Sequence, residues 1–578
     1  MTYDLVVRGG TIADGRGGAT FEADIAVAGG RIAEVGKVAE SGREEIDARG
    51  LLVTPGFVDI HSHYDGQAIW DQRLLSSGWH GVTTTVMGNC GVGFAPVRPE
   101  DRDLLVELME GVEAIPAAVL REGLTWDWAS FPDYLDALER RPHDMDVCAY
   151  LPHSALRVFV MGERAVKRET ATDDDIAEMQ RLAREAIRAG AMGFSTSKSY
   201  NHRTVAGELI PSFGADAREL EGIAVALKDE GRGVLQIILN LSPDLRREEF
   251  ELIRGMVRAS GRPLSVTVLQ RNRDPDGWRE VMEMLEGAVA EGLPMHAQIT
   301  PRPLGTLFGL DTGRHPFVFH PAFQAIADKP LADKVAAMRD PAFRARLLSE
   351  EPCSDIPDAA NRVQNFAYMF PFREPPNYAP GRDDSIKAMA EAAGKSPFEI
   401  AYDLLLEDDG QAMLFAPNSG IADYTFNACR ELLDNPNTVV AVSDGGAHVA
   451  HISDTSFPTF VLTYWGRDRP EGALDLGQMV ARLTTNPAGL VGLMDRGVLA
   501  PGFKADINVI DFDRLTIHRP YMVHDLPHGA KRLLQKADGY VATIVAGQAV
   551  YREGEATGAL PGTLVRGAQA APEAAAAE

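Results

Sequence analysis

Two histidines separated by a single residue are the clearest sign of chemistry in this sequence. His61 and His63 follow the apolar run at residues 57–60, and alternate residues of a β-strand point to the same face. Two imidazoles on one face suit a divalent transition metal. They could also be ordinary polar residues at a strand end, but the preceding sequence PGFVD makes the metal site the more specific interpretation.

A carboxylate follows a second apolar run, near the other end of the chain. Asp444 lies in the sequence Ser-Asp-Gly directly after residues 439–442. In a β/α barrel, a carboxylate at the C-terminal end of a strand lies on the face where chemistry occurs. Ser-Asp-Gly is also favourable turn chemistry, so the alternative is that Asp444 caps a turn. His448 lies four residues further on, where it could face the same site.

The segments between these residues predict a parallel sheet covered by helices. Residues 173–189 begin with three acids and carry arginines towards their end, which predicts an amphipathic helix. Strand-like apolar runs follow helical segments at residues 192–197, 234–239, 264–270 and 293–300. Strands that alternate with helices of about 10–15 residues indicate βαβ units and an α/β fold.

The two chain ends predict a separate β domain. Both ends hold short apolar runs broken by glycine turns, so residues 1–54 and 498–566 are expected to form one small β domain beside a core unit at 55–497. Within that unit, residues 304–417 are rich in proline and aromatic side chains, which predicts an insertion that serves as a lid or pocket wall. The low-complexity residues 567–578 predict a disordered tail.

Composition excludes several classes of protein. Of 578 residues, 57 are Lys or Arg and 83 are Asp or Glu, which gives a net charge of −26 and disfavours a nucleic-acid partner. No apolar stretch of about 18 residues predicts a membrane span, and the N-terminus does not resemble a signal peptide, so a cytoplasmic location is expected. Four widely spaced cysteines give no disulfide framework: Cys90, Cys148, Cys353 and Cys429.

Several motifs together carry a family resemblance. PGFVDIHSH, the late SDG and the β segments at both ends resemble the amidohydrolase superfamily, and MGNCG, LPHSALR and GFSTS resemble its D-aminoacylase branch, the N-acyl-D-amino-acid deacylases. The resemblance covers nearly the whole chain. It implies a distorted (β/α)8 TIM-like barrel with a metal site at the C-terminal strand ends, a β-sandwich built from both chain ends, and an insertion before the last barrel strand.

The same resemblance implies a ligand set. His61 and His63 match the metal ligands of the first strand, and Cys90 matches a metal-ligating cysteine. Asp444 matches the aspartate that contacts the metal and handles the proton of the attacking water. Cys90 also lies in a Gly-Asn-Cys-Gly turn that allows close approach, and a coordinated cysteine is held as thiolate. Its alternative interpretation is a buried structural thiol.

The sequence departs from the family where further histidine ligands are expected. The predicted fifth and sixth strands carry no histidine; their nearest polar residues are Gln236, Asn240 and Gln270, and about Gln270 a substrate-binding lysine is replaced. We therefore expect one metal per chain, with two as the alternative. Six residues could supply additional metal or substrate contacts: Lys198, as a carbamylated lysine or a simple positive charge, and His202, His296, His153, His80 and His448.

These features predict a metal-dependent hydrolase with zinc as the expected ion. Its substrate would be a small molecule with a non-peptide carboxamide, either an N-acyl amino acid or a related N-acyl amine. A metal of this kind activates water and polarises a carbonyl, and Asp444 would transfer the proton. Two alternatives remain open: hydrolysis of a cyclic amide, ester or lactone, and an inactive barrel with a binding role. Assembly into a homo-oligomer is also left open.

Overall fold

The structure is a computed structural model that describes residues 2–354, 359–469 and 471–573. It has the mixed α/β class predicted from the sequence, with parallel strands in one part and antiparallel strands in another. In the described part of the chain, no helix is long and apolar enough to cross a membrane.

Strands from both ends of the chain share one nine-stranded sheet, in the order β25-β24-β23-β18-β5-β1-β2-β3 with β4 paired to β1. Gly29 and Gly30 join β2 to β3 with φ values of 59° and 74°, the left-handed conformation that tight hairpins require. The strands are β1 Tyr3–Ile12, β2 Phe21–Ala28, β3 Arg31–Gly36, β4 Gly42–Asp47, β5 Leu52–Pro55, β18 Ile507–Ile510, β23 Tyr540–Val545, β24 Gln548–Arg552 and β25 Glu555–Ala556.

The strands that carry the chemistry are all parallel and form two sheets, β6-β7-β8 and β17-β13-β12-β11-β10-β9. A parallel bridge between Ser62 and Gly445 connects the chain beyond β6 to the chain beyond β17. The strands are β6 Phe57–Asp59, β7 Val82–Met87, β8 Asp146–Ala149, β9 Leu151–Pro152, β10 Gly193–Ser197, β11 Val234–Ile238, β12 Leu264–Thr267, β13 Met295–Ile299 and β17 Thr438–Val440.

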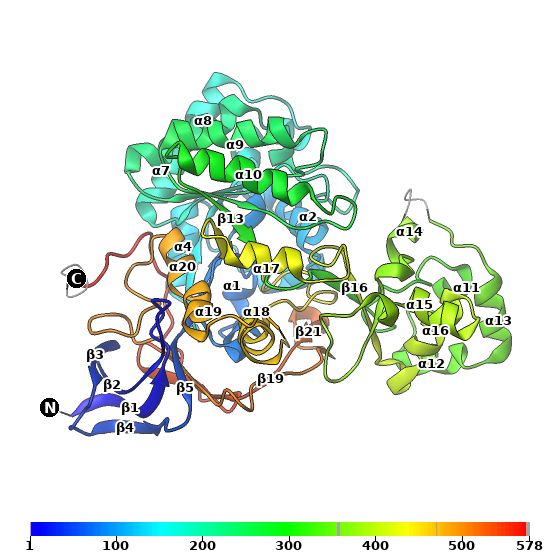
Figure 1. The fold of residues 1–578 in the computed structure, drawn as a ribbon. Coiled ribbons are helices and arrows are strands. Elements are labelled where there is room, and N and C mark those ends of the chain that lie inside the picture. Colours follow the sequence, from blue (N-terminus) through cyan, green and yellow to red (C-terminus); the bar gives the residue numbers. More distant parts are fainter. Residues whose placement is uncertain (1, 355–358, 470, 574–578) are drawn as a thin grey trace.

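Helices lie along the outside of these strands, with α7 to α10 side by side (Figure 1). The main apolar core lies between the two layers and includes Phe194 and Ile237 from strands and Leu227 and Ile253 from helices. The helices of this part are α1 Gln67–Trp70, α2 Arg102–Glu113, α3 Ala117–Gly123, α4 Phe131–Glu139, α5 His153–Met161, α6 Glu163–Val166, α7 Asp173–Ala189, α8 Ala217–Glu230, α9 Arg246–Ser260, α10 Gly277–Ala290, α17 Asn427–Asp434, α18 Phe457–Phe460, α19 Leu476–Leu483 and α20 Thr485–Leu490.

The segment before β17 forms a lobe that projects from the body, joined to it by a three-stranded antiparallel sheet (Figure 1). It has its own apolar core, which includes Phe317, Ile386 and Tyr402. The elements of the lobe are β14 Gly305–Phe308, α11 Pro321–Gln324, α12 Leu331–Met338, α13 Pro341–Ser349, α14 Ala359–Val363, β15 Phe370–Phe372, α15 Ile386–Ala393, α16 Pro397–Leu405 and β16 Met413–Pro417.

The C-terminal part adds two small antiparallel strand pairs, and Gly567 and Gln569 bond to the body of the protein. Gly567 N donates to Gly190 O at 2.8 Å, and Gln569 N donates to Gly492 O at 2.9 Å. Gly567 and Gln569, in the tail predicted to be disordered, are thus held by backbone hydrogen bonds, which do not depend on side-chain composition; residues 574–578 of that tail lie outside the described residues. The paired strands are β19 Thr516–Ile517 with β22 Ala537–Asp538, and β20 Tyr521–Val523 with β21 Arg532–Leu534.

Candidate metal centre and active site

Three potential metal ligands meet where strands β6 and β7 end. One ligand atom from each of His61, His63 and Cys90 lies within 4.8 Å of the others, and all three side chains are buried. Cys90 Sγ lies 3.4 Å from His61 Nε2. In the part of the chain that the structure describes, this is the one group of three or more such residues at that spacing.

Asp444 joins this group from the chain beyond β17. Its Oδ1 lies 3.4 Å from His61 Nε2 and 3.7 Å from His63 Nε2. Backbone bonds fix the approach, because His63 N donates to Gly445 O at 2.7 Å and Asp444 N donates to His61 O at 3.2 Å. The Ser443 hydroxyl also bonds the Asp59 carboxylate, which fastens this turn to β6. The chain beyond β6 and the chain beyond β17 therefore bring their polar side chains to one point.

The backbone at this point is strained. Cys90, Asp444 and His448 have φ values of 57°, 50° and 49°, and the β-branched Val442 has 63°. Non-glycine residues in this left-handed region cost about 1–3 kcal/mol each and persist where surrounding contacts over-determine them, often at functional sites. The fold thus holds this group of side chains in a conformation that the local sequence does not favour.

The amide of Gln298 sets the orientation of His61. Gln298 Oε1 lies 2.6 Å from His61 Nδ1, and Gln298 Nε2 donates to Ser265 Oγ at 3.0 Å. Because the amide oxygen can only accept, Nδ1 carries the proton and the Nε2 lone pair faces Cys90 and Asp444. Gln298 did not figure in the sequence analysis. The sequence feature that could have identified Gln298 is its position two residues after His296, on the same face of the strand.

A second glutamine shapes the turn that holds Cys90. Gln236 Oε1 accepts a hydrogen bond from Cys90 N at 3.0 Å, and Ser195 Oγ accepts from Gly91 N at 3.2 Å. Gly91 has a φ of 70°, and a Cβ there would lie 2.8 Å from Thr196 Cα. The glutamine on β11, where the family resemblance leads one to expect a histidine ligand, therefore supports the cysteine turn instead.

The charges around this group fit a bound cation. Burial lowers the pKa of His61 to about 4, so its imidazole is neutral and can act as a ligand. Burial raises the pKa of Asp444, but His63 and His61 outweigh that effect and hold it well below its usual range. Burial also raises the pKa of the Cys90 thiol to about 12, so a thiolate there needs a cation beside it. Two nitrogens, one sulfur and one oxygen are a donor set that suits zinc.

Comparison with known protein families identifies the family of this chain. The model of the amidohydrolase family matches residues 44–551 of the chain. This chain belongs to the amidohydrolase family. The family and the enzyme class predicted from the sequence are therefore confirmed.

Similar proteins cover the whole length of this amidohydrolase. The N-acyl-D-aspartate deacylase of Alcaligenes xylosoxydans xylosoxydans is 27% identical, over 98% of this chain and 96% of that protein. The D-aminoacylase of the same organism is 26% identical, over 97% of each. The solved structure of the N-acyl-D-glutamate deacylase of Bordetella bronchiseptica, in complex with zinc and a phosphonate inhibitor, aligns with a TM-score of 0.63 at 24% identity, over 98% of this chain and 100% of that one. That last likeness shows a shared fold.

The other polar residues near the predicted fifth and sixth strands hold loops of the amidohydrolase. Asn240 Oδ1 accepts from Tyr200 N at 2.7 Å, and Gln270 Oε1 accepts from Ala422 N at 3.1 Å. The Lys198 ammonium donates to the carbonyls of Phe213 and Ala215 at 2.8 and 2.6 Å. The charge of Lys198 is therefore directed at these carbonyls.

Two of the histidines proposed as contacts are structural. The two ring nitrogens of His80 lie 2.7 Å from Thr459 Oγ1 and 3.1 Å from Gln535 O. Those of His153 lie 2.8 Å from Thr196 Oγ1 and 2.9 Å from Glu219 Oε1. With both nitrogens in such bonds, neither ring has a position left for metal or substrate. His296 is partly exposed on β13, and its Nδ1 has no hydrogen-bond partner among the described residues.

Glu219 lies in a buried network whose loss we expect to destabilise the fold. It pairs with Arg157 at 2.7 Å and with His153. Burial raises the pKa of Glu219, but these two partners outweigh burial, so the pKa falls to about 2. Glu219→Gln should therefore lower the free energy of unfolding by about 3–5 kcal/mol at pH 7, as for other broken buried ion pairs.

Urea unfolding of wild type and Glu219→Gln at pH 7 and pH 3 measures this effect. Because the folded pKa is depressed, the contribution is present above the unfolded pKa of about 4.3 and is lost as pH falls towards 2. The two proteins should differ less at pH 3. An equal difference at both pH values would contradict the ionised role of Glu219.

Two further histidines interact electrostatically with the candidate metal ligands. Burial lowers the pKa of His202 to about 3, and the charges of His63 and His448 add to the effect, which places its ring near both. His202 Nδ1 lies 2.8 Å from Ser197 Oγ. His448 Nε2 lies 3.7 Å from the Oε2 atom of Glu113. No sequence motif marked Glu113, because it ends helix α2, far from the other site residues in the chain.

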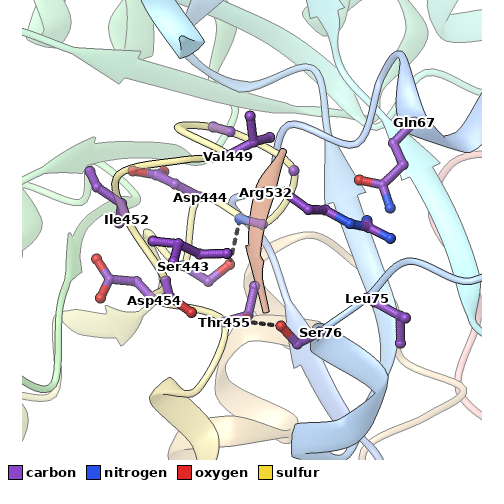
Figure 2. Close-up of a pocket in the computed structure, with 15 residues that line it drawn as sticks. Gln67, Leu75, Ser76, Ser443, Asp444, Val449, Ile452, Asp454, Thr455 and Arg532 are labelled. Carbon is purple, nitrogen blue, oxygen red and sulfur yellow. Dashed lines mark hydrogen bonds between the residues drawn. The ribbon is translucent and has the colours of Figure 1, made fainter. Parts of the chain in front are cut away.

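A small cavity of about 30 Å³ opens beside Asp444. Figure 2 shows the Asp444 carboxylate and the Arg532 guanidinium pointing away from one another, with Arg532 extending towards Gln67. Among the described residues, the segment at 304–417 contributes nothing to the lining, which comes from Gln67, Leu75, Ser76, Ser443, Asp444, Gly445, Gly446, Ala447, Val449, Ile452, Ser453, Asp454, Thr455, Arg532 and Leu533.

Proposed function

We propose that this amidohydrolase cleaves the carboxamide bond of N-acyl amino acids or related N-acyl amines. Zinc is the proposed cofactor, one ion per chain, held by His61, His63, Cys90 and Asp444. The observation that carries the proposal is the approach of Asp444 Oδ1 to within 3.4 and 3.7 Å of two histidines that also flank a cysteine. Relatives named as deacylases of N-acyl-D-amino acids support the substrate class.

We also propose how the fold is divided. The parallel strands β6 to β13 and β17 would form a distorted (β/α)8 barrel at residues 55–497, with chemistry at the carboxyl ends of its strands. The sheet built from both chain ends would be the β-sandwich domain at residues 1–54 and 498–566. The lobe at 304–417 would act as a wall of the substrate entrance. The free state of all four cysteines supports a cytoplasmic location.

The residues around the ligands suggest how the reaction proceeds. A divalent ion bound here would lower the pKa of a water molecule towards about 7 and polarise the scissile carbonyl. Asp444 would accept a proton from the attacking water as the new C–O bond forms, and would return it to the leaving nitrogen as the C–N bond breaks. Gln298 keeps the Nε2 atom of His61 free to act as a ligand. His61, Cys90 and Gln298 are buried, which keeps bulk water away from this side of the site.

A cation in the lobe is proposed to bind the carboxylate of the substrate. The guanidinium of Arg314 has no hydrogen-bond or ion-pair partner among the described residues. Burial lowers the pKa of His451 to about 3, and the charge of Arg314 adds to that effect. Gly309 N donates to Arg314 O at 2.9 Å, which places Arg314 just beyond β14. Leu307 N donates to His451 O at 2.7 Å, which ties the lobe to the loop that follows Asp444.

Metal analysis and a substrate panel test the proposal. Protein purified without added metal should contain about one divalent ion per chain, lose activity with a chelator and regain it with zinc. It should hydrolyse N-acyl amino acids faster than their α-amides, esters, lactones or cyclic amides, and comparison of D and L forms gives its stereochemistry. Arg314→Gln should raise KM for the carboxylates only, whereas Arg339→Gln, on an exposed helix end of the same lobe, should not. Two tightly held ions, or no amide hydrolysis, would refute the proposal.

A further inference from the structure

Glu113 is a buried carboxylate that lies between two histidines of the site. Its Oε1 atom lies 3.4 Å from His63 Nδ1, and its Oε2 atom lies 3.7 Å from His448 Nε2. The side chain is 3% exposed. A carboxylate so deeply buried is costly unless it is paired, so its place between two imidazoles requires a reason.

The contact with His63 joins two atoms that lack other partners. Neither His63 Nδ1 nor Glu113 Oε1 has a hydrogen bond within the described residues, and both atoms are buried. The two atoms are complementary, since Nδ1 can donate and a carboxylate oxygen can accept. A proton on Nδ1 leaves the Nε2 lone pair on the side of Asp444, 3.7 Å away.

The backbone of Glu113 supports the other end of the site. His448 N donates to Glu113 O at 2.5 Å, and Ala447 N donates to Asp444 O at 2.9 Å. The turn from Asp444 to His448 contains two left-handed non-glycine residues, so it needs contacts from outside to hold its shape. Glu113 supplies one such contact from helix α2 while its side chain faces His63.

We propose that Glu113 is a positioning residue for the metal centre. Its carboxylate accepts the Nδ1 proton of His63, which directs Nε2 towards the metal, and its carbonyl holds the turn that brings Asp444 to the same point. His61 has a neutral amide in the corresponding place, so the two histidines differ in the charge of their partners. This inference rests on the proposed metal site and adds a residue that acts through a ligand without touching the substrate.

Zinc affinity tests the role without any need for turnover. The dissociation constant for Zn²⁺ alone is measured by competition with a coloured chelator for wild type, Glu113→Gln and Glu249→Gln. Glu249 is a matched control, because it is also buried and accepts bonds from Asn240 Nδ2 at 3.0 Å and Leu241 N at 2.6 Å. Loss of an outer partner of a metal-bound histidine costs about 10–100-fold in affinity. We expect that loss in Glu113→Gln and a change within about twofold in Glu249→Gln.

Thermal unfolding of the metal-free proteins separates folding from positioning. If Glu113→Gln does not fold, Glu113→Asp carries the test, because it keeps the charge but shortens the reach, and its zinc affinity should fall in the same direction. Unchanged zinc affinity in a folded Glu113 variant, or an equal loss in Glu249→Gln, would overturn the positioning role. The wild-type constant tests the proposed metal site separately, so failure of one idea is distinguishable from failure of the other.

Discussion

Replacement of Asp444 by asparagine is expected to lower kcat about 10²–10⁴-fold, the usual range for loss of a general base. Asparagine keeps the shape of the side chain but cannot accept the proton of the attacking water. The fold should persist, because Ser443 holds the turn: its hydroxyl accepts from Gly445 N at 3.2 Å and bonds Asp59. The structure thus gives the turn-capping role to Ser443 and leaves the Asp444 carboxylate facing the histidines.

Single-turnover hydrolysis of an N-acyl amino acid by zinc-loaded protein measures this effect. Asp525→Asn is a suitable control, because Asp525 is a half-exposed acid paired with Arg532, which lines the cavity beside Asp444. That variant should stay within a few-fold of wild type. Unchanged hydrolysis by Asp444→Asn would mean that another residue takes the proton, and global unfolding would restore the turn-cap interpretation.

Replacement of Cys90 by serine is expected to remove most of the zinc affinity and, with it, activity. A hydroxyl is a far poorer ligand than a thiolate, so the loss should exceed the about 10–100-fold that follows loss of an outer partner. Cys90 Sγ lies 3.4 Å from His61 Nε2 and its thiol is 5% exposed, which fits a ligand enclosed by the other donors. The dissociation constant for zinc, measured by the same competition assay as for the Glu113 variants, gives the size of this loss.

Alkylation distinguishes the ligand role of Cys90 from a role as nucleophile. As a ligand, Cys90 should resist iodoacetamide in the zinc-loaded protein and react faster after chelation. Peptide mapping supplies internal controls, because Cys353 is exposed and should react in both states, whereas Cys148 is fully buried and should react in neither. Rapid modification of Cys90 with the zinc retained would favour the nucleophile instead.

The sequence predicted best those features of the fold that depend on neighbouring residues alone. The expected helix at residues 173–189 coincides with α7, because Thr172 caps its start in a reciprocal bond with Asp175 and Gly190 ends it in the left-handed region. Such features depend on neighbours a few residues away, which a sequence displays directly.

Several histidines show the limit of this reasoning. His80 and His153 have the same residue type as the ligands, but each ring is saturated by partners from remote segments, such as Gln535 and Glu219. A sequence shows which residues can bind a metal, and not which of their nitrogens are already bonded.

The sequence by itself determined the α/β class and the amidohydrolase family, and it singled out His61, His63, Cys90 and Asp444 as candidate ligands. Only the tertiary structure decided what surrounds them: Gln298 behind His61, Gln236 beneath Cys90, and Glu113 between His63 and His448. These partners come from strands and a helix far apart in the chain. Their contacts exist because packing of the strands and helices brings the ends of distant elements to one point. No local pattern of residues specifies which side chains then meet.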